Sequence, residues 1–307
     1  MTGTALHPYT LGGSEIPAVL NLDPYVSAYA LACRKLGVTD ASAESPAARM
    51  GTRLQAVHAE LVADDGYTVM PAPADGIVHP DLPWLVGHPD AFVVLPRDFA
   101  DLPPDQTQRA PLELKLRGLA PSEAMRMRDT VQALVYAELC DSSQAMVSEL
   151  HGGYGGIVRD EWTVERDGEL FAVIVERCEG FLSLIRRGKC PAPDGSESAR
   201  DALRARYGGL PETRVRLSRV GWEHLQRVRE LDETISAAKV QRERYAQLVQ
   251  DEIGDAVEAI TPFDTLAARW APVSSNRVDV KALRDAHPEI AAEFTRSTTT
   301  RRFEANP

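Results

Sequence analysis

The chain has 307 residues, of which 44% are hydrophobic and 26% are charged, which is typical of a globular protein with a sizeable core. No apolar run approaches the roughly 20 residues of a membrane helix. The first residues, MTGTALHPYT, lack the basic and apolar regions of a signal peptide, so we expect a cytoplasmic protein without a membrane partner. The net charge of −11 argues only weakly against nucleic acid, because a total charge does not describe local patches.

The N-terminal half predicts helices first and strands afterwards. Residues 12–15, GGSE, predict a turn and then a helix capped by Ser14. Apolar residues at three- and four-residue spacing predict a helix over 46–63. The segment LPWLVGHPDAFVVLP predicts a pair of strands with a turn near Gly87. Further elements expected before residue 120 are a helix over 27–35 and strands over 67–70 and 111–117.

The second half continues the alternation and then changes character. A helix over 122–139, strands over 144–150 and 157–164, and a helix over 169–187 complete an α/β core. Residues 218–260 are highly charged and carry an apolar stripe that approximates a heptad, which predicts a long helix or a helical hairpin. It either packs on the main domain or pairs with a partner helix.

The last residues predict a small appendage. LAARWAPV predicts a strand, VKALRDAHPEIAAEF predicts a helix, and RSTTTRRF is a basic tail. We therefore expect one domain over 1–210 and a second region over 211–307, which holds the long helix or hairpin, the small strand and helix, and the tail. The tail arginines, Arg296, Arg301 and Arg302, either contact a DNA backbone or are simply solvated.

The stretch PLELKLRG, residues 111–118, places a carboxylate and an ammonium inside an apolar run. Because side chains alternate between the two faces of a strand, the leucines share one face, and Glu113 and Lys115 share the other. The ordinary interpretation is a half-buried surface strand whose polar face is solvated.

A second carboxylate precedes the neighbouring strand. Asp90 in GHPDAFVV opens an apolar strand over 91–95, and a hairpin with 111–117 would place it near Glu113 and Lys115. Two carboxylates at one sheet edge suit Mg²⁺, which keeps several of its waters. A bound metal lowers the pKa of water, and Lys115 could orient that water, which is the chemistry of phosphodiester hydrolysis.

These residues resemble a known family. Pro89-Asp90 with Glu113-Leu114-Lys115 resembles the PD-(D/E)XK nuclease signature. The blocks GGSEIPAVLNLDPY, HPDLPWLVGHPDAFVV, GKCPAPDGSE and RVDVKALRDAHPEIAAEF are similar, in order, to those of the YqaJ-type phage nucleases, the branch that resembles lambda exonuclease. The resemblance implies a restriction-endonuclease-like α/β core, with a mixed central sheet flanked by helices, and a C-terminal helical extension.

The resemblance also implies roles for particular residues. Asp90, Glu113 and the backbone carbonyl of Leu114 would bind Mg²⁺ or Mn²⁺. Lys115 would position the attacking water, with Gln132 beside it; the alternative for Gln132 is an ordinary exposed helix residue. A 5′-phosphate would meet Ser14 at a helix N-terminus, and also His7, which stands where relatives can carry an arginine. We expect further phosphate contacts from Arg117, Arg126 and Arg128.

One position departs from the pattern. The family's third helix reads GxxLE, whereas this chain reads MGTRLQ and has Gln55 in place of the glutamate. An amide oxygen can bind a metal but brings no charge, so we expect a weakened second metal site. His58 is three residues on and could substitute. Glu60 lies about 140° round the helix from Gln55 and could not.

The implied activity is a 5′-to-3′ double-strand DNA exonuclease of phage-type recombination, which yields 3′ overhangs and 5′-mononucleotides. Its partners would be double-stranded DNA ends, a single-strand annealing protein and further copies in a ring trimer. The gene would belong to a phage or prophage, and the protein to the host cytoplasm. The alternatives are an endonuclease or nickase, and a catalytically weakened DNA-binding relative.

The cysteines predict neither a zinc site nor a redox pair. None of Cys33, Cys140, Cys178 and Cys190 forms a CxxC pair, and a cytoplasmic chain of this size needs no disulfide. They also lack the late clustering that iron–sulfur relatives of this fold require, so we expect no iron–sulfur cluster. The simplest interpretation is four core thiols.

Overall fold

The computed structural model describes residues 8–40, 46–94, 109–153, 155–208, 214–296 and 302–305. His7 and Arg301, two of the residues considered above, lie outside these ranges. The chain divides into two compact units, Met1–Gly208 and Gly209–Pro307.

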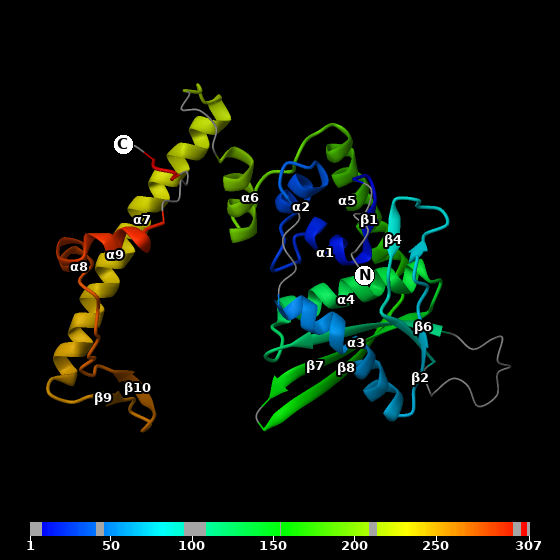
Figure 1. Ribbon diagram of the computed structural model, residues 1–307, viewed down its shortest axis with the longest axis horizontal. Coiled ribbons are helices and arrows are strands. Elements are labelled where there is room, and N and C mark those ends of the chain that lie inside the picture. Colours follow the sequence, from blue (N-terminus) through cyan, green and yellow to red (C-terminus); the bar gives the residue numbers. More distant parts are fainter. Residues whose placement is uncertain are drawn as a thin grey trace. The chain divides into compact units, whose positions relative to one another are not determined.

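A five-stranded mixed sheet forms the centre of the first unit (Figure 1). Its order is β2-β5-β6-β7-β8, and only β6 and β7 run parallel. The helix α4, Glu123–Leu139, connects these two strands, because a parallel pair requires a crossover connection. The mixed α/β architecture with a C-terminal helical extension is confirmed. The strands are β2 Thr68–Pro71, β5 Ala91–Val94, β6 Arg109–Arg117, β7 Gln144–Gly153 and β8 Gly156–Glu165.

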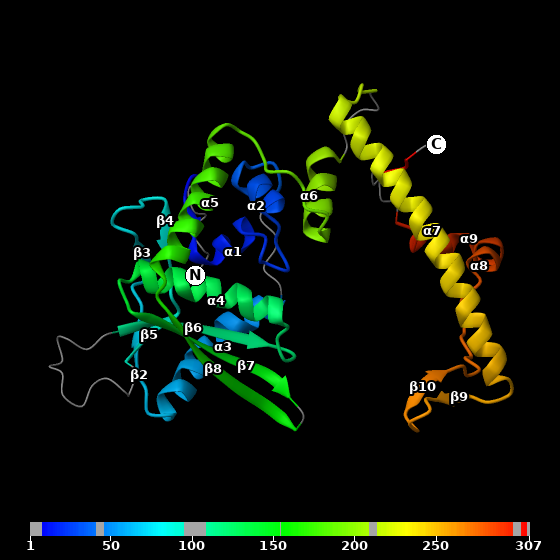
Figure 2. The same ribbon diagram turned by 180° about the vertical axis from the view of Figure 1, so that it is seen from behind.

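Helices cover both faces of this sheet (Figures 1 and 2). On one face, Val62 of α3, Pro46–Asp64, packs with Leu112 and Met146. On the other, apolar residues of α4 pack with Val147 and with α5, Gly168–Arg186. The neighbours Met146 and Val147 thus point to opposite faces, as alternation in a strand requires. The expected helix over 46–63 is confirmed, although its apolar stripe, which includes Met50 and Val57, is largely exposed.

A three-stranded sheet corrects one expectation. It consists of β1 Leu11–Gly12, β4 Leu85–Gly87 and β3 Ile77–Val78, in the order β1-β4-β3. The expected pairing of the strands on either side of Gly87 is therefore wrong, because β4 belongs to this sheet and β5 to the central one. A Cβ on Gly87 would overlap the end of the Leu139 side chain and press on Tyr136, so glycine favours the close approach of β4 to α4.

The N-terminal turn corrects a second expectation. Ser14 lies inside a 3-10 helix, Gly13–Glu15, that leads into α1, Ile16–Val19, so Ser14 is not an N-cap. Instead, the Glu15 carboxylate accepts hydrogen bonds from the Gly12 backbone N–H at 2.9 Å and from Lys35 at 2.6 Å. The helix α2, Ala28–Lys35, is confirmed and has Ser27 as its N-cap.

One helix of the first unit was not expected from the sequence. It is α6, Glu197–Tyr207, which Ser196 caps. Its buried residues Ala199 and Ala202 pack with Cys33 and Tyr29 of α2. The cap residue is a local signal, but the charged composition of the segment concealed the short apolar face.

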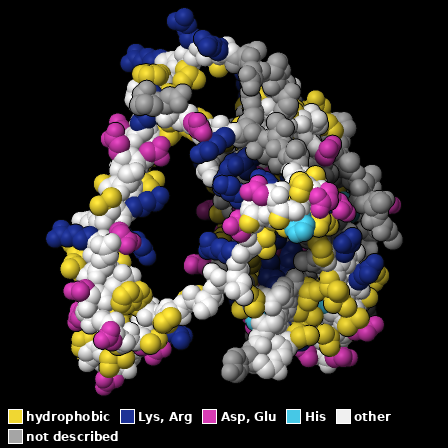
Figure 3. Space-filling view, turned by 60° about the vertical axis from the view of Figure 1, so that its left-hand side comes forward, with side chains coloured by type: hydrophobic (Ala, Val, Ile, Leu, Met, Phe, Trp, Pro, Cys, Tyr) yellow, Lys and Arg dark blue, Asp and Glu magenta, His cyan; other side chains and the backbone are white. Residues whose placement is uncertain are grey.

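The second unit is built around one long helix. The helix α7, Arg219–Ile253, runs for 35 residues and ends before Gly254, so the hairpin alternative is wrong. Among the described residues of this unit, only Ile253 of the large apolar side chains is buried, and many others lie among charged ones at the surface (Figure 3). The unit also has a strand pair, β9 Glu258–Ile260 and β10 Leu266–Arg269.

The expected single helix near the C-terminus is interrupted. It forms α8, Val280–Ala286, and α9, Pro288–Glu293. Pro288 has no backbone N–H, so it begins a new helix rather than continuing the first. No helix in the described ranges has the length and apolar character needed to cross a membrane.

Candidate functional site

Two antiparallel strands bring the predicted carboxylates to the same level of the sheet. Ala91 of β5 lies opposite Leu112 of β6, so Asp90 and Glu113 are neighbours across the strand pair. The Leu114 backbone N–H donates to Asp90 Oδ2 at 2.7 Å, and the Gln55 side chain from α3 donates to Oδ1. The expected hairpin is confirmed.

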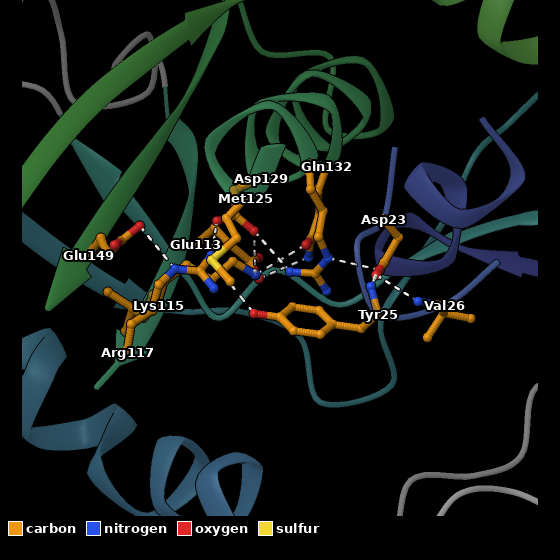
Figure 4. Close-up of polar contacts among 12 residues, drawn as sticks. Asp23, Tyr25, Val26, Glu113, Lys115, Arg117, Met125, Asp129, Gln132 and Glu149 are labelled. Carbon is orange, nitrogen blue, oxygen red and sulfur yellow. Dashed lines mark hydrogen bonds and ion pairs between the residues drawn. The ribbon is translucent and has the colours of Figure 1, made fainter. Parts of the chain in front are cut away.

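The polar face of β6 packs against α4 and is not solvated (Figure 4). Lys115 Nζ donates to Glu113 Oε1 at 2.6 Å and to Gln132 Oε1 at 3.1 Å. Gln132 Nε2 donates to the same Glu113 oxygen at 2.8 Å. Gln132 is only 2% exposed. A solvated strand face and an exposed Gln132 are therefore both ruled out.

Behind this cluster lies a buried ion-pair network that the sequence analysis missed (Figure 4). Its centre is Asp129, which is fully buried and forms ion pairs with Arg117 and Arg128. Lys115 Nζ lies 3.7 Å from Asp129 Oδ1. The sequence holds one signal, because Asp129 precedes Gln132 by three residues and so shares its helix face.

Two further carboxylates complete the network, and each forms an ion pair with one of the two arginines. Arg117 lies 3.2 Å from Glu149 of β7, and Arg128 lies 2.9 Å from Asp23. The Arg117 and Arg128 side chains are 12% and 19% exposed. Their guanidinium groups are thus held between carboxylates, and the expectation of free phosphate contacts does not fit them.

The remaining candidates for phosphate contacts lie at the surface. Arg126 is 44% exposed, pairs with Asp160 at 2.5 Å and lies 5.3 Å from the Trp162 ring. Ser14 is exposed in its 3-10 turn. Neither side chain belongs to the buried cluster around Glu113.

A cleft opens beside the carboxylates. It has a volume of about 200 Å³ and is lined by residues of α3, including Gln55 and His58, and by Asp90, Glu113 and Leu114. His58 Nε2 lies 3.0 Å from Ser148 Oγ, and burial lowers the His58 pKa to about 4. His58 is therefore neutral at pH 7, with its Nε2 already engaged.

The electrostatics of the cluster fit a divalent cation. Burial, reinforced by the Glu113 charge, raises the pKa of Asp90 to about 7. Among the described residues, Glu113 Oε2 is buried without a hydrogen-bond partner. Around this cluster five carboxyl groups face three cationic side chains. These are Asp23, Asp90, Glu113, Asp129 and Glu149, against Lys115, Arg117 and Arg128.

The protein groups alone do not enclose a metal. Within the described part of the chain, no three His, Cys, Asp or Glu side chains are grouped so that they could hold one. Two carboxylates with an open cleft beside them instead suit a hard cation that retains most of its waters.

The fold and this cluster define an α/β protein with paired carboxylates and a half-buried lysine at one edge of a mixed sheet. No protein-family model matches the chain. The uncharacterized protein YqaJ from Bacillus subtilis (strain 168) is 26% identical over 304 residues, which cover 95% of this chain and 90% of that protein. The predicted resemblance to YqaJ-type proteins is thereby confirmed.

Solved structures with a partial likeness include two exonucleases. The alkaline exonuclease LHK-Exo from Laribacter hongkongensis is 16% identical, covers 60% of this chain and 91% of its own, and has a TM-score of 0.41. The phage-related exonuclease from Haemophilus somnus 129PT is 12% identical, covers 59% and 96%, and has a TM-score of 0.42. At these values no residue role is transferred from them.

Proposed function

We propose that this chain is a metal-dependent DNA nuclease, and most directly a double-strand exonuclease. The observation that carries the proposal is the contact of Lys115, Glu113 and Gln132 beside Asp90. Burying such charges costs stability unless they are paired or serve a function. Carboxyl groups outnumber cationic side chains around this contact, which fits a divalent cation, and the resemblance to YqaJ-type nucleases supports this.

The chain's own groups would hold Mg²⁺ or Mn²⁺. Asp90, Glu113 and the Leu114 carbonyl are the proposed ligands, and in the described part of the chain Glu113 Oε2 has no hydrogen-bond partner. When bound, the metal supplies Lewis acidity and a water of lowered pKa. Gln55 already donates to Asp90, which favours a weakened second metal position. Because Ser148 already engages His58 Nε2, His58 is a poor substitute, as a metal ligand, for the glutamate that Gln55 replaces.

Lys115 would orient the attacking water. A lysine ammonium has three N–H donors, and two of them serve Glu113 and Gln132. The third remains for a water or a phosphate oxygen, and the positive charge would offset the negative charge that develops on the phosphoryl group. Gln132 bridges Lys115 and Glu113, so it fixes the distance between the two groups.

Asp129 would position Lys115 from behind. It is fully buried, lies 3.7 Å from Lys115 Nζ and is itself held by Arg117 and Arg128. Its charge attracts the ammonium toward α4. The same network ties the Asp23 segment to the strand that carries Lys115. Asp129 therefore acts through Lys115 rather than on the substrate.

The polarity and products of the reaction are proposed from the resemblance to the YqaJ-type phage nucleases. We propose 5′-to-3′ degradation that leaves 3′ overhangs and 5′-mononucleotides, by a restriction-endonuclease-like nuclease domain over 1–210. Residues 211–307 would form an appendage. An annealing protein, a ring trimer and a host-cytoplasmic location of a phage or prophage product belong to the same proposal. Arg126, which remains exposed, is the preferred phosphate contact near the site, and Ser14 and His7 remain candidates for the 5′-phosphate.

One digestion experiment tests the activity. Linear duplexes labelled at the 5′ end, with and without a 5′-phosphate, are incubated in Mg²⁺, Mn²⁺ or EDTA with the wild type and Glu113→Ala. We expect metal-dependent release of 5′-mononucleotides that Glu113→Ala lacks. If the protein cuts a closed circular plasmid, its activity is that of an endonuclease or nickase and not of an exonuclease.

Gln55 favours a second candidate, a DNA-binding protein with weakened catalysis. An amide in place of a carboxylate lowers the affinity for a second cation. Gln55→Glu decides between the two candidates in the same assay. If Gln55→Glu cuts DNA and the wild type does not, the natural chain is a DNA-binding relative rather than a nuclease.

A further inference from the structure

Two thiols that are far apart in the sequence touch in the first unit. Cys33 Sγ lies 3.7 Å from Cys190 Sγ, although the residues are 157 positions apart. Cys33 belongs to α2 and is fully buried, whereas Cys190 lies between α5 and α6 and is partly exposed. The sequence analysis did not foresee that these two thiols lie in contact, because only the fold brings them together.

A cation adjoins the more exposed sulfur. Arg206 of α6 places Nη1 3.2 Å from Cys190 Sγ and 3.3 Å from the Tyr29 hydroxyl. A guanidinium at this distance can stabilise negative charge that develops on the sulfur. Cys190 thus combines access to solvent, a neighbouring cation and a second thiol within contact distance.

We infer that Cys33 and Cys190 form a reversible disulfide when the protein meets a peroxide. The Cys190 thiolate attacks one peroxide oxygen, which gives a sulfenic acid and releases hydroxide. The Cys33 sulfur then attacks the Cys190 sulfur, the S–S bond forms, and the sulfenic oxygen leaves as water. The two thiols lose two hydrogens and two electrons, and one hydrogen peroxide becomes two waters.

The other two cysteines provide internal controls. Burial raises the pKa of both Cys140 and Cys178 to about 12, so their thiolate fractions at pH 7 are very small. No contact between either of them and another cysteine is found in the described ranges. A general oxidation of thiols would not single out the Cys33–Cys190 pair.

A bond between these residues would close a loop that contains the central sheet. A cross-link over so long a loop restricts the unfolded chain, and we expect it to raise Tm by on the order of 10 °C. The sulfurs must approach by roughly 1.7 Å to reach bonding distance. Cys33 belongs to the small apolar cluster between α2 and α6, and Cys190 packs against it, so this movement requires only local adjustment.

The test uses the intact protein in EDTA, oxidised with stoichiometric hydrogen peroxide at pH 7. The product is denatured, alkylated with N-ethylmaleimide and weighed, and its peptides are mapped. We expect two alkylated cysteines instead of four, a linked peptide pair containing Cys33 and Cys190, and a higher Tm that dithiothreitol reverses. Cys190→Ser should show neither the link nor the Tm shift, whereas Cys140→Ser should show both.

Other results would overturn the inference. Four alkylated cysteines after oxidation would show that no bond forms. A sulfinic acid on Cys190 without a linked peptide would show that Cys33 does not reach it. A link between two chains, visible as a covalent dimer, would assign the bond to another geometry. Because these readouts use no DNA, they are independent of the proposed nuclease activity.

Discussion

At the scale of single residues, the function proposed for the site depends on the position of the Lys115 ammonium. Lys115 contacts Glu113 and Gln132 directly and has Asp129 behind it. Each of these contacts crosses from β6 to α4 or runs along β6. A displacement of about 1 Å in a group that orients a nucleophile can cost a factor of 100 in rate.

The first prediction concerns the charge of Asp129. Asp129→Asn keeps the shape of the side chain but loses the attraction for Lys115 and leaves Arg117 and Arg128 with one anion fewer. We expect kcat for DNA hydrolysis to fall on the order of 10- to 100-fold while KM changes little, because the effect reaches the reacting groups only through Lys115. Steady-state digestion of a linear duplex measures both constants.

Glu138 offers a matched control on the same helix. It is also buried, at 6% exposure, and pairs with an arginine, Arg166, at 2.7 Å. Glu138→Gln therefore removes an ion pair of another buried carboxylate outside the Lys115 cluster. If Glu138→Gln and Asp129→Asn lose kcat equally, Asp129 contributes to the stability of the fold and does not position Lys115.

The second prediction concerns the pH dependence of stability through His58. Burial lowers its pKa to about 4 in the fold, against 6.5 in the unfolded chain. Above pH 6.5 His58 is neutral in both the folded and the unfolded chain, so its titration does not lower the free energy of unfolding. As the pH falls toward 4, only the unfolded state gains the proton, so stability declines. The loss at pH 5 should be about 2 kcal/mol.

Urea unfolding in EDTA at several pH values measures this decline. His58→Gln cannot titrate but keeps a donor for Ser148. The difference in unfolding free energy between the wild type and His58→Gln should therefore shift by about 2 kcal/mol between pH 7 and pH 5. A difference that stays constant across this range would contradict the assigned burial effect.

At the scale of elements, the N-terminal turn packs closely against α4 through Gly13. A Cβ on Gly13 would lie 2.3 Å from Tyr136 Cε1. The hydroxyl of the same Tyr136 accepts a hydrogen bond from Gln132 at 3.2 Å. The 3-10 turn at 13–15 thus rests on the helix that carries the site, and its glycine makes this packing possible.

The third prediction follows from this contact. Gly13→Ala should destabilise the first unit by about 1–3 kcal/mol, because Tyr136 or the turn must move to relieve the overlap. Gly180→Ala in α5 is the control, since a Cβ there meets nothing within 4 Å. We expect the control to stabilise by about 0.5–1 kcal/mol, as alanine favours a helix. Thermal unfolding of both variants tests this, and a neutral Gly13→Ala would be the contrary result.

At the scale of the whole molecule, the two units differ in how they bury apolar side chains. The buried clusters of the described chain all lie within 8–208. In the second unit, Ile253 is the buried residue of α7. Within the second unit itself, α7 therefore gains little from packing, which supplies most helical stability in proteins.

The fourth prediction follows for the separated units. A chain ending at Gly208 should unfold cooperatively, with a Tm within a few degrees of that of the full chain. Residues 209–307 alone should show helical signal that melts gradually. Circular dichroism of both fragments measures this. A truncated chain that fails to fold would show that the second unit is needed to complete the first.

The sequence by itself determined the local elements and the acidic strand pair. Helix caps such as Ser27 and Ser122, the alternation in residues 111–117, and Asp90 ahead of an apolar strand are patterns of near neighbours. Such patterns act through the backbone within a few residues, so they can be read without a fold. For that reason Asp90, Glu113 and Lys115 were found as candidates from local patterns, whereas Gln132 was found only through the resemblance to the nuclease family.

Only the tertiary structure decided which groups those residues meet. The crossover through α4 places Asp129 behind Lys115, and parallel pairing of β6 with β7 places Glu149 beside Arg117. Packing of α2 near α6 brings Cys33 to Cys190. These contacts join positions 14 to 157 residues apart, and no local period encodes them. The physical reason is that strand order and helix packing, rather than spacing along the chain, set which buried charges and thiols become partners.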